Sequence, residues 1–201
     1  MITSPAALSA PLLELVDRIR REATVIDNQI IKIDHFLNHR IEPRFMTRMG
    51  AELAARLAQF KPDLVLTAEA SGIAPGVVTG IALDVPVVYA KKYAPMIEPP
   101  AYSRIVTSPT KGGETRLVIG KKYLWEGARV VIVDDILSNG HTAAALVEMV
   151  REAGAEVFAA AFIMEKHFKR GRELLEALDV PVATLAQVLS ATPEHVEVAG
   201  A

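Results

Sequence analysis

Two adjacent aspartates, Asp134 and Asp135, follow an apolar run and precede a short polar loop in the stretch VVIVDDILSNGHT (130–142). With an ordinary aspartate pKa of about 3.9, both carboxyls are expected to be ionised and to repel each other unless cations or hydroxyl donors engage them. Carboxylates do not bind a phosphate directly, but they accept hydrogen bonds from sugar hydroxyls and coordinate magnesium. The pair therefore predicts a site for a hydroxylated ligand or a metal.

The loop after the aspartates has the composition of a phosphate site. It offers hydroxyls, a glycine that permits unusual dihedral angles and backbone amides at the start of a predicted helix. Its residues are Ser138, Asn139, Gly140, His141 and Thr142. The alternative is that Thr142 is only the N-cap of that helix. Taken with the aspartates, the loop favours a sugar phosphate, with the phosphate on the loop and the ribose on the carboxylates.

Other phosphate-binding motifs are not supported. The chain has no GxGxxG sequence, and GGETRLVIGKK has the wrong spacing for a Walker A loop and no Ser or Thr after its lysine. These absences disfavour a dinucleotide site and a P-loop.

The elements that must position these residues are read from the hydrophobic pattern. Short continuous apolar segments are typical of parallel strands buried on both faces. They are LVLTAEA (64–70), VPVVYAKK (85–92), RVVIVDD (129–135) and VFAAAFIMEK (157–166). Loops and helices separate them, and further helices are predicted over 11–23 and from Pro43 onward. The pattern predicts an α/β fold with a doubly wound, mainly parallel sheet flanked by helices, in which ligands bind at the carboxyl ends of the strands.

The segment 94–122 departs from this pattern. It opens with the Pro-rich APMIEPPAY and then reads like a hairpin that turns at Lys111-Gly112-Gly113. We predict a flexible excursion that covers the site, and an ordinary surface hairpin is the alternative. Residues 1–11 are predicted to be a loose extension, and residues 1–201 to form a single domain.

Composition excludes several classes of function. With 22 Lys and Arg against 24 Asp and Glu, the chain has no basic field to attract nucleic acid or an anionic membrane. It has no cysteine, and its five histidines show no zinc spacing. No apolar run is long enough to span a bilayer, and the N-terminus does not resemble a secretory signal. A cytoplasmic protein without nucleic-acid or membrane partners is predicted.

The motifs also carry a family resemblance. VVIVDDILSNGHT resembles the 5-phosphoribosyl 1-pyrophosphate (PRPP) signature of the type I phosphoribosyltransferases. The segments QIIKIDHFLNHRIEP, TAEASGIAPGVVTGIALDVPVVYAKK, YSRIVTSPTK and IMEKHF resemble, in order, segments of the xanthine branch of that family. The resemblance covers about residues 25–172. It implies the type I phosphoribosyltransferase fold and transfer of phosphoribose from PRPP to N9 of xanthine, with Mg²⁺ held mainly by PRPP.

The resemblance also implies roles for individual residues toward PRPP. The residues of the loop Ser138, Asn139, Gly140, His141 and Thr142 would hold the 5′-phosphate. Asp134 and Asp135 would hold the ribose hydroxyls. Pyrophosphate would lie on the loop residues Ala70, Ser71 and Gly72, with Lys91 or Lys92 close by. Each of these lysines could instead be a solvated strand end.

For the base, the resemblance implies contacts from Ile31, Asn38 and Lys166. A lysine only donates hydrogen bonds, so Lys166 favours a 6-oxo purine over adenine. The Asn38 amide can pair with the 2-oxo edge of xanthine, but it could also rotate to accept from the 2-amino group of guanine. Phe168 could pack against the base, although core packing is the alternative for an aromatic residue.

The phosphate loop bears on the mechanism. Hypoxanthine–guanine enzymes of the family commonly have an aspartate at the first position of this loop, whereas this chain has Ser138. Xanthine is acidic for a purine, so we expect it to react largely as an anion and to need little help from a protein base. Catalysis would then come from alignment of the reactants and from stabilisation of the leaving pyrophosphate. The resemblance implies that the excursion containing Lys111 closes over PRPP and excludes water.

Two other readings remain open at this stage. Guanine or hypoxanthine could be the preferred base. A PRPP-sensing purine regulator with the same fold is disfavoured, because only about 25 residues precede the resemblance and no basic recognition helix is evident. The family also implies a homodimer with its interface near the active site.

Overall fold

A computed structural model describes residues 8–28, 30–92, 100–107 and 113–200. Its helices are α1 (Ala10–Glu22), α2 (Pro43–Leu57), α3 (Ile73–Leu83), α4 (His141–Glu152) and α5 (Gly171–Glu176), with short 3-10 helices η1 (Ala58–Phe60) and η2 (Lys121–Tyr123). Its strands are β1 (Thr24–Ile26), β2 (Ile30–Lys32), β3 (Leu64–Ala68), β4 (Val87–Ala90), β5 (Ala101–Thr107), β6 (Glu114–Gly120), β7 (Arg129–Leu137), β8 (Glu156–Lys166), β9 (Val182–Ala191) and β10 (Val196–Gly200).

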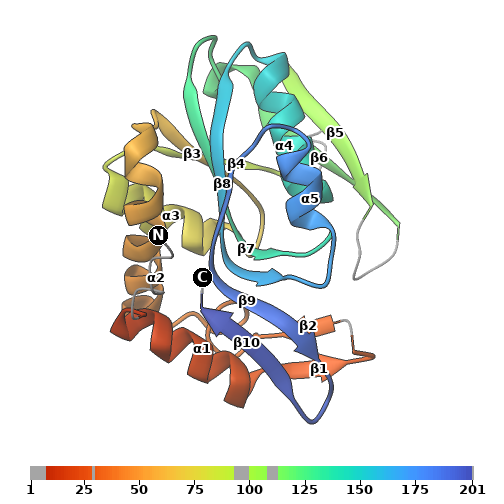
Figure 1. The fold of residues 1–201 in the computed structure, drawn as a ribbon. Coiled ribbons are helices and arrows are strands. Elements are labelled where there is room, and N and C mark those ends of the chain that lie inside the picture. The colour runs from red at the N-terminus through yellow and green to blue at the C-terminus, as the bar shows by residue number, and fades with distance from the viewer. Residues whose placement is uncertain (1–7, 29, 93–99, 108–112, 201) are drawn as a thin grey trace, which may run out of the picture.

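The central sheet has six strands in the order β10-β9-β8-β7-β3-β4. Neighbours from β9 to β4 are parallel, and only β10 pairs antiparallel. In Figure 1, α2 and α3 lie on one side of this sheet and α4 and α5 lie on the other. The predicted doubly wound, mainly parallel α/β sheet is therefore confirmed, together with its four predicted strands.

Helix packing follows the sequence pattern. The predicted apolar face of α4 is buried, with Leu146, Val147 and Val150 each at 0% exposure. Pro43 is the first residue of α2, where its missing N–H costs no helical hydrogen bond. Both helices therefore hold their faces against the sheet and fix the loops that precede them.

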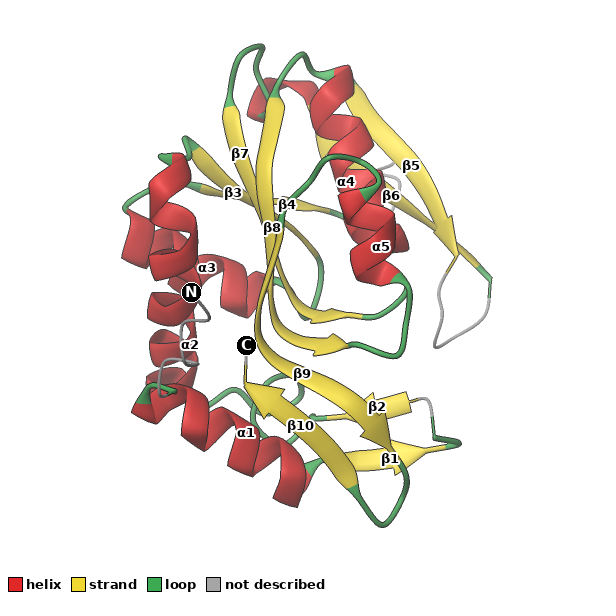
Figure 2. Ribbon diagram, in the orientation of Figure 1, coloured by secondary structure: helices red, strands yellow, loops and turns green. Residues whose placement is uncertain are grey.

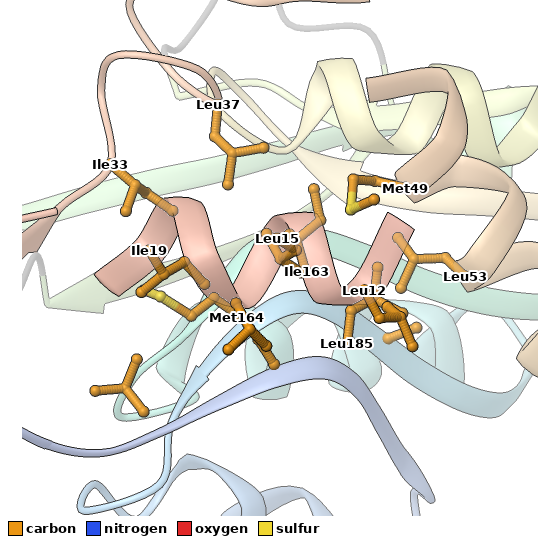
Figure 3. Packing of buried hydrophobic residues seen from close by; sticks show 14 of the residues in the cluster. Leu12, Leu15, Ile19, Ile33, Leu37, Met49, Leu53, Ile163, Met164 and Leu185 are labelled. Carbon is orange, nitrogen blue, oxygen red and sulfur yellow. The ribbon is translucent and has the colours of Figure 1, made fainter. Parts of the chain in front are cut away.

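The end of the sheet near β9 and β10 is more elaborate than the sequence suggests. β9 and β10 form an antiparallel pair, and Figure 2 shows the short β1–β2 pair and α1 beside them. Leu15 and Ile19 of α1 pack with Ile163 and Met164 of β8 in a buried cluster (Figure 3). The C-terminal residues, to which sequence analysis assigned no role, thus complete the sheet, and α1 covers it.

The segment after β4 contains the predicted hairpin. β5 and β6 pair antiparallel over their whole length, with Ala101 opposite Gly120 and Thr107 opposite Glu114. Lys91 pairs with Val118 through backbone hydrogen bonds of 2.9 Å in both directions, which attaches β6 to the end of β4. Lys111 and Gly112 lie outside the described residues, so the predicted flexibility of this hairpin stays a prediction.

Candidate active site

A cleft of about 570 Å³ opens where β3, β7 and β8 end, and Ile26, residues 30–34 and Asn38 form its opposite wall. Most of the residues singled out from the sequence line it. They are Ile31, Asn38, Ser71, Lys92, Asp134, Asp135, Ser138, Asn139, Gly140, His141, Thr142 and Lys166. Ala70, Gly72 and Lys91 are not in the lining. The fold thus brings residues more than 120 positions apart in the chain into one cavity.

The two carboxylates lie inside β7 rather than after it, because the strand continues to Leu137. The side chain of Asp134 accepts the backbone N–H of Asp135 at 2.9 Å, and the side chain of Asp135 accepts that of Ile136 at 2.8 Å. Burial, followed by repulsion from Asp135, raises the pKa of Asp134 well above its ordinary value. The ionised form of Asp134 is therefore unfavourable unless a cation or a hydroxyl donor binds beside it.

Gly72 lies directly behind Asp134. A Cβ atom at this position would collide with Oδ1 of Asp134 and Oγ1 of Thr67, and would lie 2.9 Å from the carbonyl of Ala68. The loop before α3 can approach β7 this closely only because the residue is glycine. Gly72 therefore contributes to the site by its contact with Asp134, although it does not line the cleft.

The phosphate-type loop leads into α4 through Gly140, which has a φ of 79° and is the N-cap residue. The alternative that Thr142 is the N-cap is therefore wrong, since Thr142 lies within the helix. The first intrahelical bond runs from the N–H of Ala144 to the carbonyl of Gly140 at 2.9 Å. The backbone N–H groups of residues 141–143, before this bond, have no intrahelical acceptor. Together with the helix dipole they suit an anion.

The loop after β3 forms a second part of the lining. Ser71 and Glu69 line the cleft, and the peptide bond between Glu69 and Ala70 is cis. The Glu69 carboxylate accepts the backbone N–H of Lys92. Of the lysine doublet, Lys92 lines the cleft, whereas the backbone of Lys91 is paired with β6. Lys92 is thus the lysine of this pair that is placed to meet an anion.

Asn38 follows two residues whose side chains are buried in the core. Phe36 and Leu37 are 0% and 1% exposed. The Arg18 guanidinium lies 4.3 Å from the centroid of the Phe36 ring and donates to Glu42 at 2.8 Å. α1 therefore anchors the chain on both sides of Asn38, which makes this wall of the cleft a product of packing rather than of a local motif.

Lys166 is the last residue of β8 and is only 7% exposed. Burial, followed by repulsion from Lys169, lowers the pKa of its ammonium group, while Asp135 acts in the opposite direction. Phe162, four residues earlier on the same face of the strand, lines the cleft, whereas Phe168 is 38% exposed and does not. The aromatic residue that lines the cleft beside Lys166 is therefore Phe162, whereas Phe168 lies neither in the lining nor in the core.

Sequence analysis missed several lining residues. They are Lys32, Asp34, Glu69, Thr107, Phe162 and Lys169. The period of two in a strand relates Phe162 to Lys166, and Glu69 belongs to the same EASG stretch as Ser71, so both had a sequence signal. Lys32 and Thr107 come from β2 and the β5–β6 hairpin, and only the tertiary structure brings them to the cleft.

The oxygen ligands in the cleft fit a magnesium ion that is coordinated partly by the protein and partly by a substrate. The lining contains the carboxylates of Asp134, Asp135 and Glu69, which are hard oxygen ligands. Within the described residues, no group of three or more His, Cys, Asp or Glu side chains is placed to hold a metal alone. Substrate oxygens would therefore have to supply much of the coordination.

Comparison with known proteins gives consistent matches. Residues 38–182 match the family model described as phosphoribosyl transferase domain. The chain is 51% identical over 181 residues to a xanthine phosphoribosyltransferase of Chloroflexus aurantiacus, covering 90% of this chain and 86% of that one. It is 42% identical over 176 residues to one of Deinococcus deserti, covering 87% and 91%. A crystal structure of adenine phosphoribosyltransferase from Thermoanaerobacter pseudethanolicus has a TM-score of 0.73 and 27% identity, covering 87% of this chain and 99% of that one.

Proposed function

The chain belongs to the phosphoribosyltransferase family, and from this premise we propose that it transfers the 5-phosphoribosyl group of PRPP to N9 of xanthine. The products would be xanthosine 5′-monophosphate and pyrophosphate, a reaction of purine salvage. The observation that carries the proposal is one cleft in which a phosphate-type loop, an aspartate pair and a buried lysine converge. Each of these features suits a different part of the two substrates.

The cleft divides into four subsites in this proposal, for the 5′-phosphate, the ribose, the pyrophosphate and the base. Residues 138–142 receive the 5′-phosphate on backbone amides and hydroxyls, and Asp134 and Asp135 accept the ribose hydroxyls. Ser71 and Lys92, on the loops after β3 and β4, meet the pyrophosphate. Ile31, Asn38 and Lys166 hold the base. This arrangement would set the base and the pyrophosphate on opposite sides of the ribose, as an in-line displacement requires.

The chemistry makes little demand on a general base. The phosphate loop begins with Ser138 and has no carboxylate, and xanthine is acidic enough to react as its anion. The ammonium group of Lys166 would stabilise the oxygen on which that negative charge resides. Bound magnesium would neutralise charge on the departing pyrophosphate. The main task of the protein is then to align the reactants and exclude water from an oxocarbenium-like ribose.

Base selection follows from Lys166 and Asn38. One solved structure that the chain resembles is an adenine enzyme. An ammonium group, however, only donates hydrogen bonds and would face the donating 6-amino group of adenine. We therefore expect adenine to be a poor substrate. Guanine and hypoxanthine, which also carry a 6-oxo group, are the alternative substrates, because the Asn38 amide can rotate to serve either a 2-oxo or a 2-amino edge.

We further propose that the enzyme is a homodimer. α3 has no charged residue and follows the pyrophosphate loop directly, yet Val77 and Ile81 on its outer face are 41% and 72% exposed. A helix that is apolar on all sides is normally covered on all sides. A second copy packed on this face would place the interface beside the active site.

The decisive experiment measures pyrophosphate release by the purified protein with Mg²⁺ and PRPP, using xanthine, guanine, hypoxanthine and adenine as separate acceptors. The proposal predicts that xanthine gives the largest kcat/KM and adenine the smallest. Equal use of guanine would overturn the base assignment of Asn38 while leaving phosphoribosyl transfer in place. If the protein binds PRPP but releases no pyrophosphate with any of the four bases, a PRPP-sensing regulator would be favoured instead.

A further inference from the structure

The segment 165–172 leaves β8 and enters α5, and it contacts the cleft at two places. Lys166 and Lys169 contribute to the lining on the base side. Gly171, the first residue of α5, lies behind the phosphate loop at the other end. One short piece of chain therefore touches both the purine subsite and the phosphate subsite.

The contact between Gly171 and the phosphate loop is a backbone contact. A Cβ atom on Gly140 would lie 3.0 Å from both Cα and the carbonyl oxygen of Gly171. A Cβ atom on Gly171 would collide with the carbonyl oxygen of Ser138 and lie 2.8 Å from Cδ1 of Leu137. Two glycines are needed for this approach, so any side chain at position 171 must displace the loop or the helix.

The two ends of the segment are tied together by an ion pair between the buried Glu165 and the half-buried Arg172. Glu165 is 1% exposed, and its carboxylate accepts hydrogen bonds from Nε of Arg172 at 2.9 Å and from its NH2 group at 2.5 Å. Arg172 also donates to the carbonyl of Val182 at 3.0 Å. Thr184 and Gln187 of β9 donate to the same carboxylate at 3.3 and 3.2 Å. Both carboxylate oxygens of Glu165 and all three guanidinium nitrogens of Arg172 thus have a hydrogen-bond partner.

The pair is ionised at neutral pH. Burial opposes ionisation of Glu165. The hydrogen bonds and positive charge of Arg172, together with hydrogen bonds from Gln187 and His167, outweigh burial and hold the pKa of the carboxyl below its ordinary value. The same contacts raise the pKa of Arg172 above its ordinary value. Its two parallel hydrogen bonds define the orientation of the first turn of α5 as well as its position.

We propose that the Glu165–Arg172 pair and Gly171 are positioning residues that set the distance between Lys166 and the phosphate loop. The proposal rests on the proposed function, since the two ends of the cleft are assigned there to the base and to PRPP. Glu165 points to the opposite face of β8 from Lys166, so it acts through its neighbours and not on a substrate. A buried ion pair adds little net stability compared with apolar packing, whereas it does specify geometry.

The first test replaces Gly171 by alanine and compares it with Gly50→Ala. Gly50 is equally crowded, because a Cβ there would lie 2.6 Å from Cγ2 of Val78, but it packs α2 on α3 away from the phosphate loop. We expect both variants to lower the melting temperature. Only Gly171→Ala should raise KM for PRPP, on the order of tenfold, with a smaller change in kcat, as expected for a displaced binding loop.

The second test uses Arg172 and its neighbour. Arg172→Met removes the ion pair with Glu165, whereas Arg172→Lys keeps the positive charge but has only one donor group. Arg170→Met is the control, because it removes an exposed ion pair with Glu173 in the same turn. We expect Arg172→Met to raise KM for both PRPP and xanthine, Arg172→Lys to be intermediate, and Arg170→Met to match the wild type. This series carries the test by itself should Gly171→Ala fail to fold.

The outcomes separate this proposal from the proposed function. Wild-type protein is assayed in parallel, and its failure to release pyrophosphate with any base would overturn the function itself. If the wild type is active, wild-type KM values in folded Arg172→Met would overturn the positioning role. An equal rise of KM in Gly50→Ala and Gly171→Ala would do the same, because it would show a general packing defect.

Discussion

The aspartate pair combines two opposing demands in one strand. Asp134 is half-buried beside a second carboxylate, Asp135, where its ionised form is disfavoured. The same position is where the proposed ribose hydroxyls would require acceptors. Function and stability should therefore respond in opposite directions when the charge is removed.

Asp134→Asn tests this opposition. Because the folded-state pKa lies above the ordinary value, the folded protein holds the proton more tightly, and stability is lost as pH rises through the folded pKa. The amide removes that loss, so the variant should have a higher melting temperature near pH 7.5. The gain should shrink as pH falls toward about 3.9, the ordinary aspartate pKa. Loss of a charged acceptor should lower kcat/KM for PRPP by about 10- to 100-fold.

Thermal unfolding across this pH range and steady-state kinetics check both parts. Asp27→Asn, which removes an exposed carboxylate outside the lining, is the matched control and should change neither quantity. If Asp134→Asn is less stable than wild type near neutral pH, the ionised Asp134 side chain does not destabilise the folded protein as proposed.

Lys166→Met keeps the aliphatic stem and removes the donor. We expect KM for xanthine to rise by about 10- to 100-fold, the effect of losing a hydrogen bond to a charged group, while KM for PRPP changes less. Discrimination against adenine should also weaken, because the repelling donor is gone. Kinetics with both bases measure this, with Lys122→Met, on the exposed η2 segment, as the control. Unchanged base preference would remove Lys166 from base recognition.

At the scale of elements, the site depends on how closely neighbouring loops approach. The loop between β3 and α3 touches β7 through Gly72, and the phosphate loop between β7 and α4 touches α5 through Gly140. Both contacts put backbone where a side chain would not fit. Each of these two loops is therefore held by a close contact with a neighbouring element, and displacement of that element should also displace the loop.

Gly72→Ala tests the first of these contacts. The added methyl group collides with Asp134 and Thr67, so it should cost about 1–3 kcal/mol of stability and lower kcat/KM by displacing the carboxylate. Gly127→Ala is the control, because a Cβ there meets nothing within 4 Å although φ is +77°. The control should lose stability through backbone strain alone and keep its kcat/KM. Full activity of Gly72→Ala would show that Asp134 tolerates displacement.

For the whole molecule, the distribution of apolar surface bears on assembly. No helix in the described ranges is both long and apolar enough to cross a bilayer. The outer face of α3 exposes Val77 and Ile81. Leu13 on α1 is also exposed, at 55%, but it stands on a helix with charged neighbours. The contrast between the two helices makes α3 the better candidate for contact with a second copy.

Ile81→Glu should therefore convert the proposed dimer to a monomer. The measurement is molar mass by light scattering after size exclusion, which should fall from about twice the chain mass of 21.7 kDa to that mass. Leu13→Glu introduces the same charge on α1 and should leave the dimer intact. A monomeric wild type, or an Ile81→Glu variant that stays dimeric, would contradict the assignment of α3.

The sequence by itself determined what is local. The apolar runs that form β3, β4, β7 and β8 were recognisable because a strand buried on both faces needs continuous apolar residues. The aspartate pair and the phosphate loop were recognisable because all their residues lie within a single stretch, 130–142. Such features depend on neighbours in the chain, so their residue types report them directly.

Only the tertiary structure decided which distant segments meet. The antiparallel β9–β10 pair, the anchoring of Asn38 through Arg18 and the choice of Phe162 over Phe168 rest on contacts between residues far apart in the chain. The contact of Gly171 with Gly140 is of the same kind. A glycine in the sequence shows that a side chain is absent, but it does not show which backbone segment packs in that space. Packing selects these partners, and many sequences with the same local pattern could pack differently.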